Sequence, residues 1–574
     1  MRLNLLLRPA LLMTVLATSL NAQQHTTNAT GLMETSIAAA PSCGTQHMMR
    51  FDRAKALRNT IANAPEVHRQ AVALAKGKGV RMMSADEETF FAPDFVTQMW
   101  LQIRAVRVHM GNRARIWVDV RDTGRADVKA KLPILIGSLE DSTAAGSRNP
   151  RKGIIENDID VFGPTPTTVG DDYYDFLLFD ITDQQILGFF QPTDQTTDEF
   201  SNRRNMLYID SREGLIKTSS VLNTLAHEFQ HLIHYGQNPA AELFINEGAS
   251  EVAGIMCGYP DRKNTSYLRN TNTSMFSFPS DDNGINQAYE RALTFMHYLY
   301  EQYGEGFLHS VLRTRMMGMS AINDALATAH PTNALAKWEI AGRGFAVANW
   351  LQTSDDQRYA YKVNITSTSQ PRAKQLRVYS SSNFRRNDTV TVLPYGAAYL
   401  IYENPPVLTL KIKGRYHYRV MAIGYRGDEV EVMDFESGQP AVIGSPQDLT
   451  RYDRVVLVIT ELSNATQKIT WDVNEGISAI DDETSAGAAT RFVAVTPNPV
   501  QSTSEISFVN EGKAGVTLEL FSPTGEVVRT LMSNESLPAG THRVPFDATG
   551  LAAGMYLARL SEGDRSATHL VIVR

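Results

Sequence analysis

One helix-forming segment constrains this chain more than any other part of it. Residues 219–236 read SSVLNTLAHEFQHLIHYG, and their apolar side chains recur every three or four positions, which predicts an amphipathic helix. Its buried face comprises Leu222, Leu225, Ala226, Phe229 and Ile233. His227 and His231 lie on the opposite face, one turn apart, where two imidazoles can bind the same zinc ion. The fold must therefore bury one side of this helix and bring further ligands to the other.

The acid beside these histidines predicts a hydrolytic site. Glu228 flanks the two histidines and can reach a water at the metal, which is the position of a general base. A catalytic zinc needs a third protein ligand and an open fourth position. The His-x-x-Gly-x-x-His extension of metzincins is absent, because His234 and Gln237 stand where it would continue. The alternative for the motif alone is a helix with solvated histidines.

A second predicted helix follows at 241–256 and supplies two carboxylates. Its sequence is AELFINEGASEVAGIM, in which Glu247 and Glu251 are four residues apart and share a face. We expect Glu247 to be the third zinc ligand. We expect Glu251, one turn further on, to accept a hydrogen bond from a ligand imidazole and fix its tautomer. A solvated helix edge is the alternative for both.

These two helices resemble those of known peptidases. HEFQH followed by NEGASE is similar to the thermolysin-type arrangement, although the gap from His231 to Glu247 is shorter, so the connecting loop must differ. The hyicolysin family of bacterial zinc peptidases is a closer match over about residues 170–310, and His234 departs from the polar residue expected there. The similar blocks are 188–210, 227–235, 245–251 and 289–304. The resemblance implies a secreted zinc endopeptidase with Glu247 as ligand and Glu251 as its neighbour.

The C-terminal segment resembles a different kind of domain. Residues 495–574 are similar to the C-terminal sorting domain of type IX secretion cargo, through Pro497-Asn498-Pro499, the stretches 515–531 and 537–560, and the terminal LVIVR. The resemblance implies a Bacteroidetes-type envelope, the type IX secretion machinery as a partner, and export through the periplasm and across the outer membrane. An ordinary fibronectin-like accessory domain is the alternative.

The whole chain is expected to be α+β: a thermolysin-like zinc peptidase unit, with a mixed sheet and active-site helices, followed by two all-β sandwich domains. The start resembles a signal peptide, with Arg2 and Arg8 before a short apolar run. No other stretch is apolar enough to cross a membrane, so no transmembrane span is expected in the mature chain. The expected parts are a signal peptide (1–22), a prosegment or N-terminal arm (23–90), the catalytic domain (91–355), a β-sandwich (362–475), a linker (476–490) and the sorting domain (491–574).

The net charge limits the class of binding partner, and the low cysteine content limits the disulfides that the fold can contain. The net charge of −7, from 62 acidic and 55 basic residues, argues against nucleic acid or an anionic membrane as the main partner. The zinc-peptidase interpretation implies a protein or peptide substrate. Only Cys43 and Cys257 are present, so no disulfide framework holds the fold. Cys43 leaves three possibilities open: a latency ligand on the zinc, an inert thiol, or a disulfide with Cys257. Its Cys-Gly-Thr sequence also resembles the latency segment of some pappalysin-type peptidases.

Several weaker expectations complete the prediction. Tyr289 and His297 are candidate donors to a developing oxyanion, with core packing as the alternative for each. The strand at 205–209 is expected to be the sheet edge along which a peptide aligns. Calcium has weak support at Asp171-Asp172 and at 280–284, where solvated turns are the favoured interpretation. The rival function is a secreted adhesin or glycan-binding protein on an inactive peptidase fold.

Overall fold

The computed structural model divides the chain into two compact units, Met1–Gly476 and Ile477–Arg574. It describes residues 42–573, except 78–81, 85, 170, 184, 213–217, 280–283, 334–335, 381–386, 406–407, 414–417, 436–451, 476–489, 523–525 and 564. The expected signal peptide, the first part of the expected prosegment and nearly all of the expected linker lie outside the described residues. Each unit is described by itself below.

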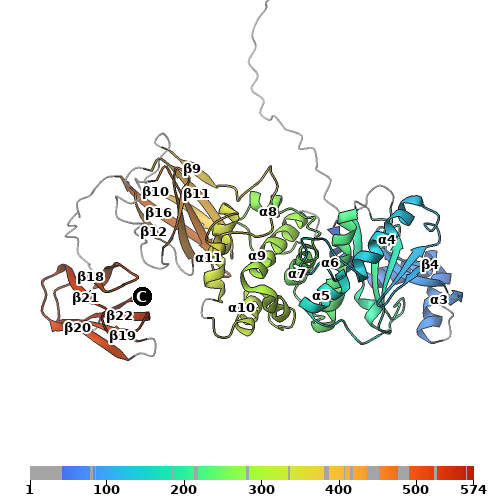
Figure 1. The fold of residues 1–574 in the computed structure, drawn as a ribbon, viewed down its shortest axis with the longest axis horizontal. Helices are drawn as coiled ribbons and strands as arrows, with labels where there is room; N and C mark the ends of the chain where they lie inside the picture. The colour runs from blue at the N-terminus through green and yellow to red at the C-terminus, as the bar shows by residue number, and fades with distance from the viewer. Residues whose placement is uncertain are drawn as a thin grey trace, which may run out of the picture. The chain divides into compact units, whose positions relative to one another are not determined.

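An eight-stranded mixed sheet forms the start of the first unit (Figure 1). Its strands are β1 (Ser42–Cys43), β2 (Met82–Ser84), β3 (Glu87–Asp94), β4 (Met99–Met110), β5 (Ala114–Asp119), β6 (Tyr174–Phe179), β7 (Ile186–Phe190) and β8 (Asn205–Asp210). Their order across the sheet is β1-β7-β8-β6-β5-β4-β3-β2. β5, β6 and β8 are parallel, whereas β7 is antiparallel to β8.

The predicted edge strand is wrong. The strand expected at 205–209 is β8, which lies inside the sheet between β7 and β6. Every residue of β8 is buried, as expected for a strand covered on both faces. The edge next to the predicted helix 219–236 is instead formed by β7, onto which the two residues of β1 are added.

Helices cover both faces of this sheet. One face packs against α4 (Ala126–Glu140), α5 (Ile154–Phe162) and α6 (Thr218–Gln237), and the other against α2 (Arg53–Asn63) and α3 (Pro65–Ala75). Successive residues of β6 divide between the two cores: Phe176 joins the α6 side and Leu177 joins the α2 side. Residue 90, the expected end of the prosegment or arm, lies inside β3. The helices α2 and α3, which precede it, pack in the second core of the sheet.

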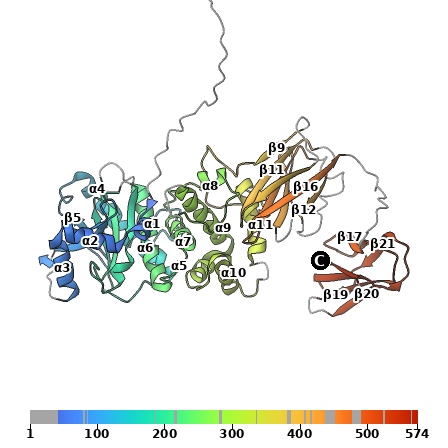
Figure 2. The same cartoon turned by 180° about the vertical axis from the view of Figure 1, so that it is seen from behind.

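The remaining helices of the first unit extend from α6 through α7 and α9. They are the short α1 (Thr45–Arg50) directly after β1, then α7 (Leu243–Met256), α8 (Thr265–Arg269), α9 (Ile285–Val311), α10 (Gly318–Ala329) and α11 (Trp338–Leu351), with single 3₁₀ turns at Pro192–Gln195 and Gln357–Tyr359. α7 lies between α6 and α9, and both views show the three side by side (Figures 1 and 2). α7 is buried over nearly its whole length, from Phe244 to Met256. This placement encloses the face of α6 that carries the histidines.

Two β-sheets complete the first unit. Their strands are β9 (Arg377–Tyr379), β10 (Asn387–Val392), β11 (Ala397–Glu403), β12 (Leu408–Lys413), β13 (Tyr418–Arg426), β14 (Glu429–Phe435), β15 (Arg454–Glu461) and β16 (Gln467–Glu475). The sheet β10-β16-β12 shares a core with the sheet β14-β13-β15-β11-β9. The other face of the larger sheet packs against α11, where Trp350 stacks on Tyr399 with ring centroids 5.5 Å apart.

The second unit is also all-β. It contains β17 (Arg491–Thr496), β18 (Thr503–Asn510), β19 (Val516–Phe521), β20 (Val527–Glu535), β21 (Gly540–Asp547), β22 (Gly554–Glu562) and β23 (Arg565–Val573). The sheets β17-β18-β21 and β20-β19-β22-β23 share one apolar core. The expected combination of a mixed α+β, helix-rich region with C-terminal all-β sheets is therefore confirmed. None of the described helices is long and apolar enough to cross a membrane.

Candidate metal centre

Two neighbouring helices bring three of the predicted ligands together. His227 and His231 lie one turn apart on α6, and Glu247 faces them from α7. Glu247 Oε2 is 3.2 Å from His227 Nε2 and 3.5 Å from His231 Nε2. All three side chains are buried, and Glu247 is 0% exposed. The helical spacing of the two histidines and the packing of α7 on α6 create this convergence.

A fourth side chain from the N-terminal start of the described chain lies at the same point. Cys43 in β1 has its Sγ 3.3 Å from His231 Nε2. The ligating atoms of Cys43, His227, His231 and Glu247 all lie within 4.8 Å of one another. Neither cysteine forms a disulfide in this structure, so the alternative of a Cys43–Cys257 disulfide does not describe it.

These four residues could hold one metal ion, and their chemistry suits zinc. Imidazole nitrogen, carboxylate oxygen and thiolate sulfur are the usual zinc donors. Two ligands at about 2.1 Å from a tetrahedral ion are about 3.4 Å apart, close to the 3.2–3.5 Å separations found here. Glu247 Oε1 is buried without a hydrogen-bond partner among the described residues. A buried carboxylate oxygen left in this way is costly unless a cation joins it.

The charges of the cluster are strongly coupled. Burial favours the neutral form of Glu247, but the positive charge of His231 and hydrogen bonds from both histidines outweigh it and lower the pKa of Glu247. Burial likewise opposes a charge on His231, yet Glu247 raises the pKa of that histidine. A metal ion that binds here takes the place of a proton on the imidazole.

The hydrogen-bond partners of the ligands differ in part from expectation. His231 Nδ1 lies 3.1 Å from Asn246 Oδ1 and 3.0 Å from Ser250 Oγ, both on α7. Glu251 Oε1 is 4.0 Å from His227 Nδ1, too far for a hydrogen bond. It accepts one from Arg262 Nε at 2.7 Å instead. Sequence reasoning missed Asn246 and Ser250, although both stand within one turn of Glu247.

Glu228 lies beside the cluster, and both of its carboxylate oxygens are buried. Its side chain is 0% exposed, and neither oxygen has a hydrogen-bond partner among the residues described. Burial raises the pKa of Glu228, against the opposing effects of His231, His227 and the Cys43 thiol. A buried carboxyl without a partner is costly, which marks Glu228 as a residue kept for a reason other than stability.

The two candidate oxyanion donors lie in different places. Tyr289 on α9 is 0% exposed and packs against Cys43. Its hydroxyl has no hydrogen-bond partner among the described residues, and burial and then the charge of Glu247 raise its pKa. His297, two turns further on, has its Nε2 3.2 Å from Glu301 Oε1 and 3.3 Å from the Val363 carbonyl. Tyr289 borders the cluster, whereas His297 is a core histidine whose Nε2 is paired and whose Nδ1 is buried without a partner among the described residues.

His234 does not enter the cluster. It follows His231 by three residues on α6 and is buried. Burial first, and the charge of His231 second, lower the pKa of His234 to about 3. This imidazole is therefore neutral near pH 7 and adds no charge beside the ligands.

The acidic segments considered for calcium carry no further support. Asp171 accepts two hydrogen bonds from Arg115, at 2.8 and 2.9 Å, so its oxygens are already paired with a cation. The segment 280–283 lies outside the described residues. Asp171 and Asp172 do not belong to the metal-binding group found in the described part of the chain.

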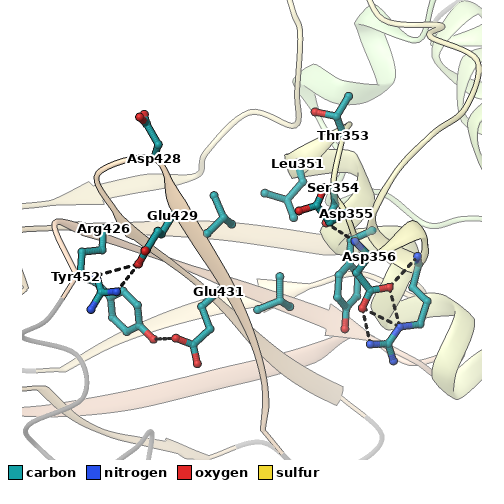
Figure 3. Close-up of a pocket in the computed structure, with 14 residues that line it drawn as sticks. Leu351, Thr353, Ser354, Asp355, Asp356, Arg426, Asp428, Glu429, Glu431 and Tyr452 are labelled. Carbon is teal, nitrogen blue, oxygen red and sulfur yellow. Dashed lines mark hydrogen bonds and ion pairs between the residues drawn. The ribbon is translucent and has the colours of Figure 1, made fainter.

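A cavity of about 930 Å³ with an acidic lining lies elsewhere in the first unit, between the end of α11 and the β13–β14 hairpin (Figure 3). Three of its carboxylates already have partners: Asp356 pairs with Arg358, Glu429 with Arg426, and Glu431 with the Tyr452 hydroxyl. Its residues do not join the four-ligand cluster. We therefore regard the cavity as a solvated seam between the helices and the β-sheets.

Comparison with known proteins identifies one part of the chain. Residues 494–574 match the model of the secretion system C-terminal sorting domain. The chain ends in a sorting domain. The expected export across the outer membrane, to the cell surface or the medium, is thereby confirmed, and the secretion machinery is a partner. No curated protein matches the chain.

A solved structure adds little to this. A β-D-glucuronidase from Dictyoglomus thermophilum is similar over 31% of this chain and 36% of that chain, with 5% sequence identity and a TM-score of 0.11. The chain thus spans about a third of that enzyme's length. A likeness at this level carries no argument about fold or function.

Proposed function

We propose that the chain is a secreted zinc endopeptidase with a thermolysin-like catalytic unit of the hyicolysin type. The observation that carries the proposal is the convergence of His227, His231 and Glu247 beside the buried carboxylate of Glu228. The proposal keeps the expected order of signal peptide (1–22), prosegment or arm (23–90), catalytic domain (91–355), β-sandwich (362–475), linker (476–490) and sorting domain (491–574).

His227, His231 and Glu247 would hold the ion. When bound, zinc polarises a carbonyl and makes a water more acidic. Glu228 Oε would accept the proton of the attacking water and later deliver it to the leaving amine. Asn246 and Ser250 would hold the His231 ring in one orientation. In this proposal Glu251 positions Tyr289 through Arg262. Glu251 accepts a hydrogen bond from Arg262, whose guanidinium carbon lies 4.9 Å from the centre of the Tyr289 ring.

The substrate would lie along β7. This strand is the sheet edge next to α6 once the two residues of β1 are set aside. An extended peptide can pair with the backbone of such an edge. The Tyr289 hydroxyl, which is buried and without a partner among the described residues, is the donor we assign to the developing oxyanion.

Removal of the metal tests this function. We expect the purified Cys43→Ser chain, loaded with zinc, to cleave casein, to lose that activity when a chelator removes the ion, and to regain it with one equivalent of zinc. The Cys43→Ser chain is used because Cys43 occupies the same cluster. Casein left intact by the zinc-loaded chain would contradict the proposal and favour the rival, an adhesin on an inactive peptidase fold.

A further inference from the structure

The segment Ser42–Arg50, called the latch here, lies on the edge of the sheet where a substrate is expected. Ser42 pairs with Ile186 and Cys43 with Gly188, in parallel. The Gly44 amide donates a hydrogen bond to the Gly188 carbonyl at 2.8 Å. The latch therefore uses the backbone groups of β7 that an extended peptide would use.

The contact between the latch and β7 is closely fitted. A Cβ on Gly44 would come 2.8 Å from Phe189 Cβ and 3.1 Å from Ile186 Cγ2. Both distances are shorter than ordinary van der Waals contact, so any side chain at this position pushes the latch away from the sheet. Glycine is what allows the preceding residue to reach the cluster.

Further contacts hold the latch after Gly44. His47 Nδ1 lies 3.2 Å from Asp183 Oδ2. Met48 lines a cavity of about 350 Å³ beside His231 and Leu243. Phe51, the next residue after the latch, is buried in the core under α2. These anchors hold the part of the latch that follows Cys43.

Cys43 places its thiol where the site needs an open position. It is buried against Tyr289, and its Sγ lies 3.3 Å from His231 Nε2. With Cys43 the site has four protein donors, the pattern of a closed structural zinc site. Without it the site has three donors and room for water, the pattern of a catalytic one.

We propose that Cys43 is the fourth metal ligand and that the latch holds the peptidase in an inactive state. This inference rests on the proposed function and deepens it. The thiol proton passes to solvent when the sulfur binds the ion, and withdrawal of the latch reverses the step with water as the new ligand. Residues 52–55, just after the latch, are exposed, so a cut there would free the latch and leave the buried part of α2 in place.

Cobalt substitution reads the sulfur ligand without any assay of activity. The full chain is stripped of metal and loaded with one equivalent of Co²⁺, and its near-ultraviolet absorption is recorded. We expect a thiolate-to-cobalt charge-transfer band in the unaltered chain and its loss in Cys43→Ser. Gly44→Val keeps the thiol but should displace the latch, so we expect the same band to fall several-fold.

The second cysteine provides the matched control. Cys257 is buried away from the cluster, with its Sγ 3.5 Å from Asp158 Oδ1, so Cys257→Ser should keep the full band. A band that persists in Cys43→Ser, or that is missing from the unaltered chain, would overturn the proposed ligand.

Casein cleavage then separates this inference from the proposed function. We expect zinc-loaded Cys43→Ser to be at least about tenfold more active than the unaltered chain, because activity scales with the open fraction. Because the backbone of the latch also pairs with β7, the same assay is run on Cys43→Ser/Gly44→Val, which lacks both the thiol and the close fit of the latch. A Cys43-dependent band together with an inactive Cys43→Ser/Gly44→Val chain would sustain the ligand and overturn both the peptidase and the latency. Equal activity of the unaltered and Cys43→Ser chains would sustain the peptidase and overturn the latch.

Discussion

Glu228→Gln, introduced into the Cys43→Ser chain, is expected to lower kcat for casein by about 10²–10⁴-fold, the usual contribution of a general base. The substitution keeps the size and shape of the side chain but removes the group that accepts the proton. Zinc content should stay at one equivalent, because the ligands are His227, His231 and Glu247. The measurement is initial cleavage rate together with bound zinc on the same protein sample.

Glu242→Gln is the matched control. Glu242 precedes α7 and accepts a hydrogen bond from the Gly318 amide at 2.5 Å, which an amide oxygen can replace. We expect its activity to remain within about twofold of the parent, because a substitution away from the site usually has a small effect. Full activity in Glu228→Gln would refute the proposed mechanism, and so would a parallel loss in the control.

Glu247→Ala is expected to have the second large effect, on metal affinity. Loss of an outer partner of a metal ligand usually costs 10- to 100-fold in affinity, so loss of a direct ligand should cost more than about 100-fold. The substitution leaves two histidines whose shared carboxylate, 3.2 and 3.5 Å from their Nε2 atoms, is gone. Competition with a chromophoric chelator measures the change in the Cys43→Ser background.

Glu251→Gln separates the two carboxylates of α7. Glu251 is 4.0 Å from His227 Nδ1 and hydrogen-bonded to Arg262, so we expect its substitution to change zinc affinity by less than about tenfold. If Glu251→Gln weakened zinc binding as much as Glu247→Ala, the assignment of Glu247 as the ligand would be wrong.

Helix geometry is the part of the site that the sequence predicts best. Residues four apart on a helix always share a face, so the spacing of His227 and His231 is enough to pair them. Glu247 requires only that the next helix pack on the first. The sequence raises Cys43 as one possible zinc ligand, but it does not decide between the alternatives, because Cys43 and His231 are 188 residues apart. Their contact depends on β1 pairing with β7, which joins distant parts of the chain.

The order of strands is not predictable for a related reason. The sequence predicts β6 and β8 as buried strands, and both are buried throughout. β7 has the equally apolar sequence ILGFF. Both of its faces are covered, one by α6 and the other by the core under α2. Apolar content therefore reports burial of the faces and says nothing about which strand lies at the edge. The hydrophobic pattern predicts β4, β5, β6 and β8, but it does not predict β7 or the order of the strands.

The N-terminal arm shows the same limit. Its helical segments are recognisable by composition, but α2 and α3 fill one core of the sheet through Ala56 and Ala71. A contribution of this kind depends on tertiary packing, which short-range periodicity does not encode. If the latch is removed during maturation, these helices can stay, because the exposed residues 52–55 precede the first buried position of α2.

Anomalous diffraction from crystals of the zinc-loaded Cys43→Ser chain would locate the ion itself, on which the proposed peptidase depends. We predict one strong zinc peak within about 2.0–2.2 Å of His227 Nε2, His231 Nε2 and a Glu247 carboxylate oxygen, with Glu228 beside it and not bound to it. A chain that takes up zinc but shows no peak at these atoms, or a peak only in the acidic cavity of Figure 3, would contradict the proposed metal centre.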